Sequence, residues 1–221
     1  MLEAGAYREK SCECVAAAVR NRYDCGGKSH RGLELAGELR ITGGRLGRRR
    51  IQVPPAADQG KVRPTSDRVR EALFSSLQND VVDARVVDAF AGSGALGIEA
   101  LSRGAASVLF IEKQARVART LEQNIQVLGL EPHAEIQIGD VSRRLAACED
   151  SVFDLFFADP PYAWKLDENF TGQVLRTLKI GGLLVLERDK RSEDTLPGGL
   201  SLQRERVYGG TRISTWQRSV V

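Results

Sequence analysis

The sequence predicts an α/β fold with a mostly parallel seven-stranded sheet, helices on both faces and a C-terminal antiparallel hairpin. Three observations lead to this prediction. Short apolar runs alternate with amphipathic stretches from residue 84 onward, as in a parallel sheet with crossover helices. The glycine-rich segment Asp88–Gly97 directly follows the first apolar run. Leu200–Tyr208 and Arg212–Gln217 alternate like the two strands of a final hairpin.

The chain begins with segments outside this pattern. Residues 1–37 show no sustained periodicity, and we expect them to form a poorly ordered N-terminal extension. Glu38–Thr42 and Arg45–Val53 are expected to be short strands on either side of a turn at Gly43-Gly44. We therefore expect residues 38–62 to form a small basic β-hairpin attached to the main domain.

The main domain is expected to span residues 63–221. Its first helix follows Arg63-Pro64-Thr65-Ser66, where Ser66 or Thr65 is placed to cap it. The later strands are expected at Arg85–Phe90, Ser107–Glu112, Ala134–Ile138, Phe153–Ala158 and Gly182–Glu187, before the final hairpin. The helices between them are expected at Gly97–Arg103, Ala115–Leu128, Val141–Ala147 and Asn169–Leu178.

The composition is that of a soluble protein with a substantial core, since 42% of the residues are hydrophobic and 28% are charged. No apolar run approaches the roughly 18 residues that a membrane helix needs. Met1–Lys10 is too polar for a secretory signal, so we expect a cytoplasmic protein. The four cysteines fit no standard zinc spacing, and we expect no metal site.

Positive charge is concentrated in one segment. The net charge of the whole chain is +3, but residues 40–70 alone carry nine basic and two acidic residues, a net of +7. Such a segment on a mildly acidic body favours a polyanionic partner such as a nucleic acid. The candidate RNA-binding residues are Arg45, Arg48, Arg49, Arg50 and Arg68.

The glycine-rich segment predicts a site for a cofactor that contains adenosine. Gly92, Gly94 and Gly97 form a GxGxxG pattern after a strand and at the start of a helix, where glycine lets the backbone turn tightly and approach a ligand. Glu112 follows Gly92 by 20 residues, at the end of the next strand. By itself this arrangement fits the dinucleotide site of an NAD-dependent oxidoreductase equally well.

Acidic residues recur where the expected strands end. Asp88, Glu112, Asp140 and Asp159 each lie at or just after the end of a different strand. The carboxyl ends of parallel strands line the ligand crevice of an open sheet. Glu112 is suited to accept hydrogen bonds from ribose hydroxyls, Asp140 from an adenine amino group, and Asp88 from a cationic amino acid group.

Asp159-Pro160-Pro161-Tyr162 indicates the kind of chemistry. The two prolines have no backbone N–H, so the segment offers acceptors, namely the Asp159 carboxylate and the Pro160 carbonyl. Such a pair of acceptors suits a substrate with an amino group, and Tyr162 offers a ring on which a base can stack. We therefore expect Asp159, Pro160 and Tyr162 to be the catalytic residues. Trp164 either helps to hold the base or packs against the fold.

These motifs resemble those of known enzymes. Asp88–Gly94 is similar to the cofactor motif of class I, Rossmann-like methyltransferases, and Asp159–Tyr162 resembles the motif of those that methylate amino groups. The strings Arg40–Gly47 and Arg63–Phe74, together with Tyr208–Thr211, resemble the bacterial 16S rRNA guanine-N2 methyltransferase family. The resemblance covers about residues 38–218; residues 1–37 depart from the family pattern.

The resemblance implies S-adenosylmethionine as cofactor and the exocyclic N2 amine of a guanine in 16S rRNA as the methylated group, within the small ribosomal subunit. It also implies that the Arg63–Thr65 loop folds over the methionine end of the cofactor. The full set of candidate cofactor-binding residues is Asp88, Phe90, Gly92, Ser93, Gly94, Glu112, Lys113, Asp140, Val141, Arg63 and Thr65. We expect a monomer.

Three alternatives remain at this point. A DNA amino-methyltransferase shares both motifs but usually carries a target-recognition region, and no insertion follows Asp159. An NAD-dependent oxidoreductase explains the glycines and Glu112 but neither Asp159–Tyr162 nor the basic segment. A ribosome-binding protein without activity would have no need of an intact Asp159–Tyr162 motif.

Overall fold

Seven strands form the main sheet in the order β5-β4-β3-β6-β7-β9-β8, and all are parallel except those of the final hairpin. The computed structural model describes residues 37–54, 66–161, 164–192, 196 and 198–220. The strands of this sheet are β3 (Arg85–Asp88), β4 (Ser107–Glu112), β5 (Ala134–Ile138), β6 (Phe153–Ala158), β7 (Leu178–Asp189), β8 (Leu200–Tyr208) and β9 (Thr211–Arg218). The predicted architecture is therefore confirmed.

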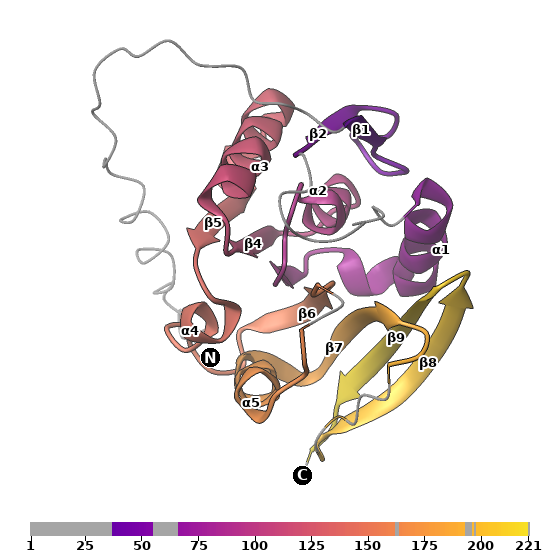
Figure 1. Cartoon of the computed structure of the whole chain (residues 1–221), viewed down its shortest axis with the longest axis vertical. Coiled ribbons are helices and arrows are strands. Elements are labelled where there is room, and N and C mark those ends of the chain that lie inside the picture. The colour runs from indigo at the N-terminus through magenta and orange to yellow at the C-terminus, as the bar shows by residue number, and fades with distance from the viewer. Residues whose placement is uncertain (1–36, 55–65, 162–163, 193–195, 197, 221) are drawn as a thin grey trace, which may run out of the picture. The chain divides into compact units, whose positions relative to one another are not determined.

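Helices cover both faces of the sheet (Figure 1). The helices are α1 (Asp67–Leu77), α2 (Ala95–Ser102), α3 (Ala115–Leu128), α4 (Val141–Leu145) and α5 (Glu168–Thr177), with short 3-10 turns at Gln78–Val81 and Glu131–His133. Neighbouring strand residues point to opposite faces. Val86 and Phe157 therefore lie in the core beneath α1–α3, whereas Val87 and Phe156 lie in the core with α4 and α5.

The helix ends follow local sequence signals. Asp140 caps α4 by accepting the Arg143 N–H, and Asp167 caps α5 by accepting the Phe170 N–H. Gly129 ends α3 in the left-handed conformation. Ser66 is the N-cap residue of α1 as predicted, but its side chain makes no capping hydrogen bond; the alternative, Thr65, lies outside the described residues.

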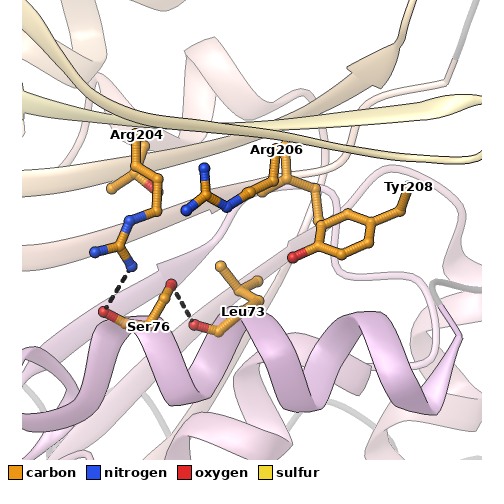
Figure 2. A pocket seen from close by; sticks show the side chains of 7 residues that line it. Leu73, Ser76, Arg204, Arg206 and Tyr208 are labelled. Carbon is orange, nitrogen blue, oxygen red and sulfur yellow. Dashed lines mark hydrogen bonds between the residues drawn. The ribbon is translucent and has the colours of Figure 1, made fainter.

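The C-terminal hairpin reverses at the predicted glycines, between Tyr208 and Thr211. It adds β9 next to β7 and β8 at the edge of the sheet. A small hollow separates this hairpin from α1 (Figure 2). It is lined by Leu73, Ser76, Arg204, Arg206, Tyr208, Ile213 and Thr215, none of which is a candidate site residue. Arg204 also donates to the Ser76 carbonyl at 3.3 Å, so the hairpin is tied to the end of α1.

The prediction for the N-terminal hairpin was wrong in one respect. A hairpin exists, but its strands are short: β1 (Gly37–Arg40) and β2 (Arg50–Val53) pair antiparallel. Gly43-Gly44 is not a two-residue turn between them, because the whole segment 41–49 connects the strands. The loop is closed by backbone hydrogen bonds from Ile41 to the Arg49 carbonyl and from Arg48 to the Ile41 carbonyl, at 2.8 and 2.9 Å.

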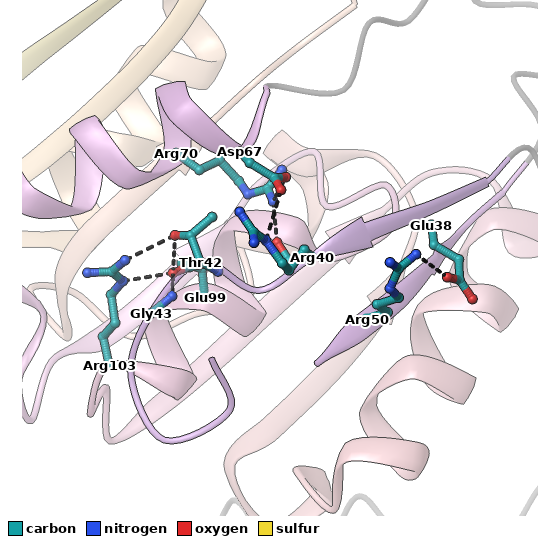
Figure 3. A network of polar contacts seen from close by, with 9 residues as sticks. All are labelled: Glu38, Arg40, Thr42, Gly43, Arg50, Asp67, Arg70, Glu99 and Arg103. Atoms are coloured by element: carbon teal, nitrogen blue, oxygen red, sulfur yellow. Dashed lines mark hydrogen bonds and ion pairs between the residues drawn. The ribbon is translucent and has the colours of Figure 1, made fainter. Parts of the chain in front are cut away.

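The reason for this difference is a buried carboxylate on α2. Glu99 is fully buried and accepts hydrogen bonds from the Thr42 main chain and hydroxyl and from the Gly43 N–H, at 2.7–2.9 Å (Figure 3). Arg103 forms an ion pair with the same carboxylate at 2.8 Å. Gly44 has φ +73°, and a Cβ there would lie 1.9 Å from the Ser102 carbonyl. The glycines therefore serve close docking on α2.

All described residues belong to one unit, Glu34–Val221. The division into 1–37, 38–62 and 63–221 stays a prediction, and the first of these segments lies almost entirely outside the described residues. Within the described part of the chain, no helix is long and apolar enough to cross a membrane.

Candidate active site

The carboxyl ends of β3, β4, β6 and β7 lie side by side. Asp88 of β3 pairs in register with Phe110 of β4 and Phe157 of β6, and Ala158 of β6 pairs with Leu186 of β7. The segments that follow these strands therefore meet along one edge of the sheet, as expected for the ligand crevice of such a fold.

The three glycines of the loop after β3 have different physical roles. Gly92 and Gly94 have φ angles of +54° and +81°, which other residues rarely adopt. A Cβ on Gly94 would lie 2.4 Å from Leu121 Cδ1 of α3, and one on Gly97 would lie 2.2 Å from the Phe110 ring. Gly92 and Gly94 thus permit the turn, while Gly94 and Gly97 permit close packing on α3 and β4.

Glu112 holds this loop from the neighbouring strand. Its carboxylate accepts the Gly92 N–H at 3.0 Å through Oε2 and the Gln114 N–H at 2.8 Å through Oε1. The side chain is buried, with 8% of its residue surface exposed. Each carboxylate oxygen has a second lone pair, so Glu112 can accept further hydrogen bonds from a ligand.

Asp88 lies beneath the loop. It is 2% exposed, and its carboxylate accepts the Gly97 N–H at 2.9 Å. Burial raises the pKa of Asp88 to about 7; the Gly97 hydrogen bond opposes this rise, and the negative charge of Glu112 adds to it. At neutral pH a substantial fraction of this carboxyl group is therefore protonated, and a nearby cation would favour its ionised form.

The remaining candidates on the cofactor side surround the ends of β4 and β5. Asp140 is exposed at the N-terminus of α4, Val141 is buried beside it, and Lys113 is exposed directly after Glu112. Asp140 Oδ1 accepts the Arg143 N–H at 3.2 Å. Ser93 is half-buried, and its carbonyl accepts a hydrogen bond from Asn124 of α3 at 3.0 Å.

Asp159 follows β6 and keeps a solvent-exposed surface, whereas Pro160 is buried. Desolvation by the surrounding protein raises the pKa of Asp159 well above its ordinary value. The negative charges of Glu187 and Asp88 raise it further. Glu187 lies on β7 and Asp88 on β3, the two strands on either side of β6. The exposed surface leaves Asp159 accessible to a substrate.

Glu187 is the site residue that sequence reasoning missed. It is buried in β7, one residue after the Leu186 that pairs with Ala158 of β6. The signal was present, because Glu187 also stands at the end of an expected strand, as Asp88 and Glu112 do.

Aromatic packing links the glycine loop to the Asp159 segment. Phe90 contacts Trp164 with ring centroids 5.1 Å apart, and both rings contact Phe170 of α5. The Trp164 carbonyl accepts a hydrogen bond from Arg188 at 2.9 Å, and the Trp164 N–H donates to the Pro161 carbonyl at 2.8 Å. Of its two expected roles, Trp164 therefore fulfils the packing role.

The remaining candidates lie on the N-terminal hairpin, on α1 or outside the described residues. Arg45, Arg48, Arg49, Arg50 and Arg68 are all exposed, the first four on the N-terminal hairpin and the last on α1. Tyr162, Arg63 and Thr65 lie outside the described residues. Within the part of the chain that the structure describes, no three His, Cys, Asp or Glu residues cluster as a metal site would require.

The strand order separates this site from that of a dinucleotide-binding oxidoreductase. When the strands of the main sheet are counted from β3, the first five lie in the order 3-2-1-4-5, that is β5-β4-β3-β6-β7. This order is common to both folds. In the dinucleotide-binding fold the sixth strand is a further parallel strand at the edge. Here β9 is antiparallel and lies between β7 and β8.

Comparison with known proteins agrees with this geometry. The family model described as Conserved hypothetical protein 95 matches residues 39–217. The ribosomal RNA small subunit methyltransferase D of Escherichia coli is 35% identical over 190 residues, which cover 83% of this chain and 91% of that protein. The Haemophilus influenzae protein of the same name is 33% identical over 177 residues, covering 78% and 90%.

Solved structures agree as well. The Escherichia coli protein yhhF has a TM-score of 0.73 and 36% identity, and the alignment covers 84% of this chain and 100% of that one. Thermus thermophilus TrmN, at 22% identity and a TM-score of 0.57, shares the fold. The chain has the fold of these methyltransferases and belongs to the ribosomal RNA small subunit methyltransferase D family, the family of Conserved hypothetical protein 95.

Proposed function

We propose that the protein transfers a methyl group from S-adenosylmethionine to the exocyclic N2 amine of a guanine in 16S rRNA of the small ribosomal subunit. One observation carries this proposal: the glycine loop after β3 and the Asp159-Pro160-Pro161 segment after β6 lie at the ends of adjacent parallel strands. A cofactor on the first and an amine at the second would be neighbours. The names of the relatives support rRNA as the substrate.

The residues around the glycine loop fit such a cofactor. A Cβ on Gly92 would have Phe90 O at 4.0 Å as its nearest neighbour, so the outer side of the loop is open. In the proposal, Glu112 accepts from the ribose hydroxyls, Asp140 accepts from the adenine amine, and the Asp88 carboxyl group faces the cationic amino acid end. In the same proposal Phe90, Ser93, Gly94, Lys113 and Val141 would contact the cofactor. Arg63 and Thr65, which lie outside the described residues, would bind its methionine end, as the resemblance implies.

The Asp159 segment would hold the amine. The cofactor supplies an activated methyl group, so the protein must mainly align the attacking nitrogen with it. The guanine N2 lone pair is delocalised into the ring and is a poor nucleophile. Hydrogen bonds from N2–H to the Asp159 carboxylate and the Pro160 carbonyl would localise this lone pair and stabilise the positive charge that develops on nitrogen. Tyr162 would stack on the base.

Asp159 would also receive the proton that the methylated amine releases. Its raised pKa makes it a better proton acceptor than an ordinary aspartate, provided that it is ionised when the substrate binds. A stacked base cannot reach such a site, so the target guanine would be unpaired or flipped out. Arg45, Arg48, Arg49, Arg50 and Arg68 would bind the surrounding phosphates. We propose a cytoplasmic monomer.

Methyl transfer to defined RNA tests the proposal. Small subunits from cells that lack the gene are incubated with the purified chain and methyl-labelled cofactor, and the labelled nucleotide is identified by digestion and mass spectrometry. We expect one N2-methylguanosine in 16S rRNA. Label on an adenine, on DNA or on no nucleic acid would contradict the proposal. A rise in melting temperature with NAD but not with S-adenosylhomocysteine would favour an oxidoreductase instead.

A further inference from the structure

One buried side chain touches both the N-terminal hairpin and the glycine loop. Asn124 of α3 is 4% exposed. Its Oδ1 accepts the Gln52 N–H of β2 at 2.8 Å, while its Nδ2 donates to the Gln52 carbonyl at 2.9 Å and to the Ser93 carbonyl at 3.0 Å. The amide orientation is fixed by these partners, because the reverse orientation would place its oxygen against two carbonyls.

The Asn124 side chain pairs with the backbone of β2 in the way that a residue of a neighbouring strand does. Asn124 pairs with both the N–H and the carbonyl of one residue of β2, and β2 lies beside α3 (Figure 1). A second contact lies one turn further along α3, where Arg49 donates to the Val127 carbonyl at 3.2 Å. The hairpin that carries the basic residues is thus attached to α3 at two successive turns.

The contact with Ser93 holds the backbone between two glycines of the loop. Ser93 stands between Gly92 and Gly94, whose positive φ angles are open to other conformations because glycine lacks a Cβ. Glu112 fixes one side of this loop through Gly92, and Asn124 fixes the other through Ser93. Leu121, one turn before Asn124, packs against Gly94. A displacement of α3 or β2 would therefore move the loop.

We infer that Asn124 is a positioning residue that couples RNA binding at the hairpin to cofactor binding at the glycine loop. The inference rests on the proposed function. RNA phosphates bound to Arg48–Arg50 would hold β2 in place. Through Gln52, β2 would then hold the Asn124 amide, and this amide would hold the Ser93 carbonyl of the glycine loop. Cofactor binding would order the same chain of contacts from the other end. Such coupling is reciprocal, so each ligand tightens the other by the same factor.

The test measures this factor directly. The dissociation constant of small subunits lacking the modification is measured by filter binding, with and without saturating S-adenosylhomocysteine, and the ratio of the two constants is the coupling factor. For the wild-type protein we expect a factor of at least about five, the lower end of typical couplings. In Asn124→Ala the coupling factor should fall to within about twofold of one, because the hydrogen bonds to Gln52 and to Ser93 are both lost.

Two control variants separate positioning from mere structure. Ile125→Val removes one methylene from the core on the same helix, so it lowers stability without touching Gln52 or Ser93. Glu122→Ala removes an exposed side chain on α3, again without touching Gln52 or Ser93. Both should keep the wild-type coupling factor. Asn124→Leu, which fills a similar volume without any donor or acceptor, replaces Asn124→Ala if that variant does not fold.

The failures of the two proposals look different. A wild-type protein that binds S-adenosylhomocysteine and methylates the subunit, but with a coupling factor of one, overturns the inference and leaves the proposed function standing. A factor in Asn124→Ala equal to that of wild type does the same, as does a factor in Ile125→Val that falls as far. A wild-type protein that binds no S-adenosylhomocysteine overturns the proposed function itself.

Discussion

Glu112 Oε2 accepts the main-chain N–H of Gly92 at 3.0 Å, which joins the end of β4 to the glycine loop after β3. The two residues are 20 positions apart in the sequence, and dinucleotide-binding sites have the same spacing between their glycine loop and their acidic residue. The acid therefore has a structural role in shaping the loop as well as a proposed role in binding the ribose. Any variant of Glu112 tests both.

Replacing Glu112 by Ala should weaken binding of S-adenosylhomocysteine by roughly 1.5–3 kcal/mol, because a charge-assisted hydrogen bond to the ligand is lost. Calorimetry measures the affinity. Glu112→Gln is the matched control, since it keeps the side-chain shape and one acceptor oxygen. Its affinity for S-adenosylhomocysteine should lie between those of the wild-type protein and Glu112→Ala. Unchanged affinity in Glu112→Ala would remove Glu112 from the cofactor site.

The triple variant Arg48→Ala, Arg49→Ala and Arg50→Ala should weaken binding to small subunits. If each arginine neutralises one phosphate, the slope of log affinity against log salt should become shallower by roughly 2, at about 0.7 per single-strand contact. Cofactor affinity without RNA should stay close to wild type, because the Asn124 contacts with Gln52 and Ser93 remain although the Arg49 contact with Val127 is lost. Arg85→Ala, which removes an exposed arginine at the opposite end of β3, is the control. A salt slope equal to that of wild type would show that these arginines only aid solubility.

Much of this fold could be predicted because local patterns and tertiary packing agree. The bounds of β4, α3, β5 and β6 are those expected from apolar runs and from the stop signal at Gly129. The strand-end rule likewise placed Asp88, Glu112 and Asp159 along one edge. These signals are contained within short stretches of the chain, so one sequence is enough to detect them.

The errors came from contacts between distant segments. Gly43-Gly44 has the local sequence of a hairpin turn, but Glu99, more than 50 residues later, binds this segment through the Thr42 and Gly43 main chain. The sequence around Gly43 contains no signal that predicts this contact with Glu99. Asn124 is a similar case, because its partners at Gln52 and Ser93 are 72 and 31 residues away. In the sequence it is one more polar residue on a helix.

The raised pKa of Asp88 predicts a specific dependence of stability on pH. Its pKa is about 7 in the folded protein against an ordinary value of 3.8. Between these values the folded state holds a proton that the unfolded state has released, so this group makes the free energy of unfolding fall as pH rises from about 4 to 7, and contributes no further change above that. The full loss is at most roughly 4 kcal/mol, for three pKa units.

Asp88→Asn tests this dependence, because Asn cannot ionise and its oxygen can still accept the Gly97 N–H. Urea unfolding of both proteins at pH 4.5, 6 and 8 gives the free energies. The stability of the variant relative to wild type should increase from pH 4.5 to pH 8. A difference that is constant across this range would show that Asp88 titrates normally, near pH 4.

Asp159 is predicted to act in the methyl-transfer step, and three measurements on two variants separate its roles. Asp159→Ala removes an acceptor and its charge, so single-turnover transfer to unmodified subunits should slow by about 10²–10³, while affinity for S-adenosylhomocysteine changes little. Asp159→Asn keeps the shape and one acceptor oxygen. If positioning of the amine dominates, Asn should retain substantial activity; if negative charge is needed, Asn should fall nearly as far as Ala.

The pH profile adds the decisive contrast. The pKa of Asp159 is raised by crowding and by Glu187 and Asp88, and only the ionised form can accept from the amine and take up its proton. The wild-type single-turnover rate should therefore increase with pH through this raised pKa. In Asp159→Asn the part of that increase that comes from Asp159 should be absent, whatever activity remains, while Asp88, whose pKa is about 7, still titrates. A wild-type rate in Asp159→Ala would exclude Asp159 from the reaction, and with it most of the case for methylation of an amino group.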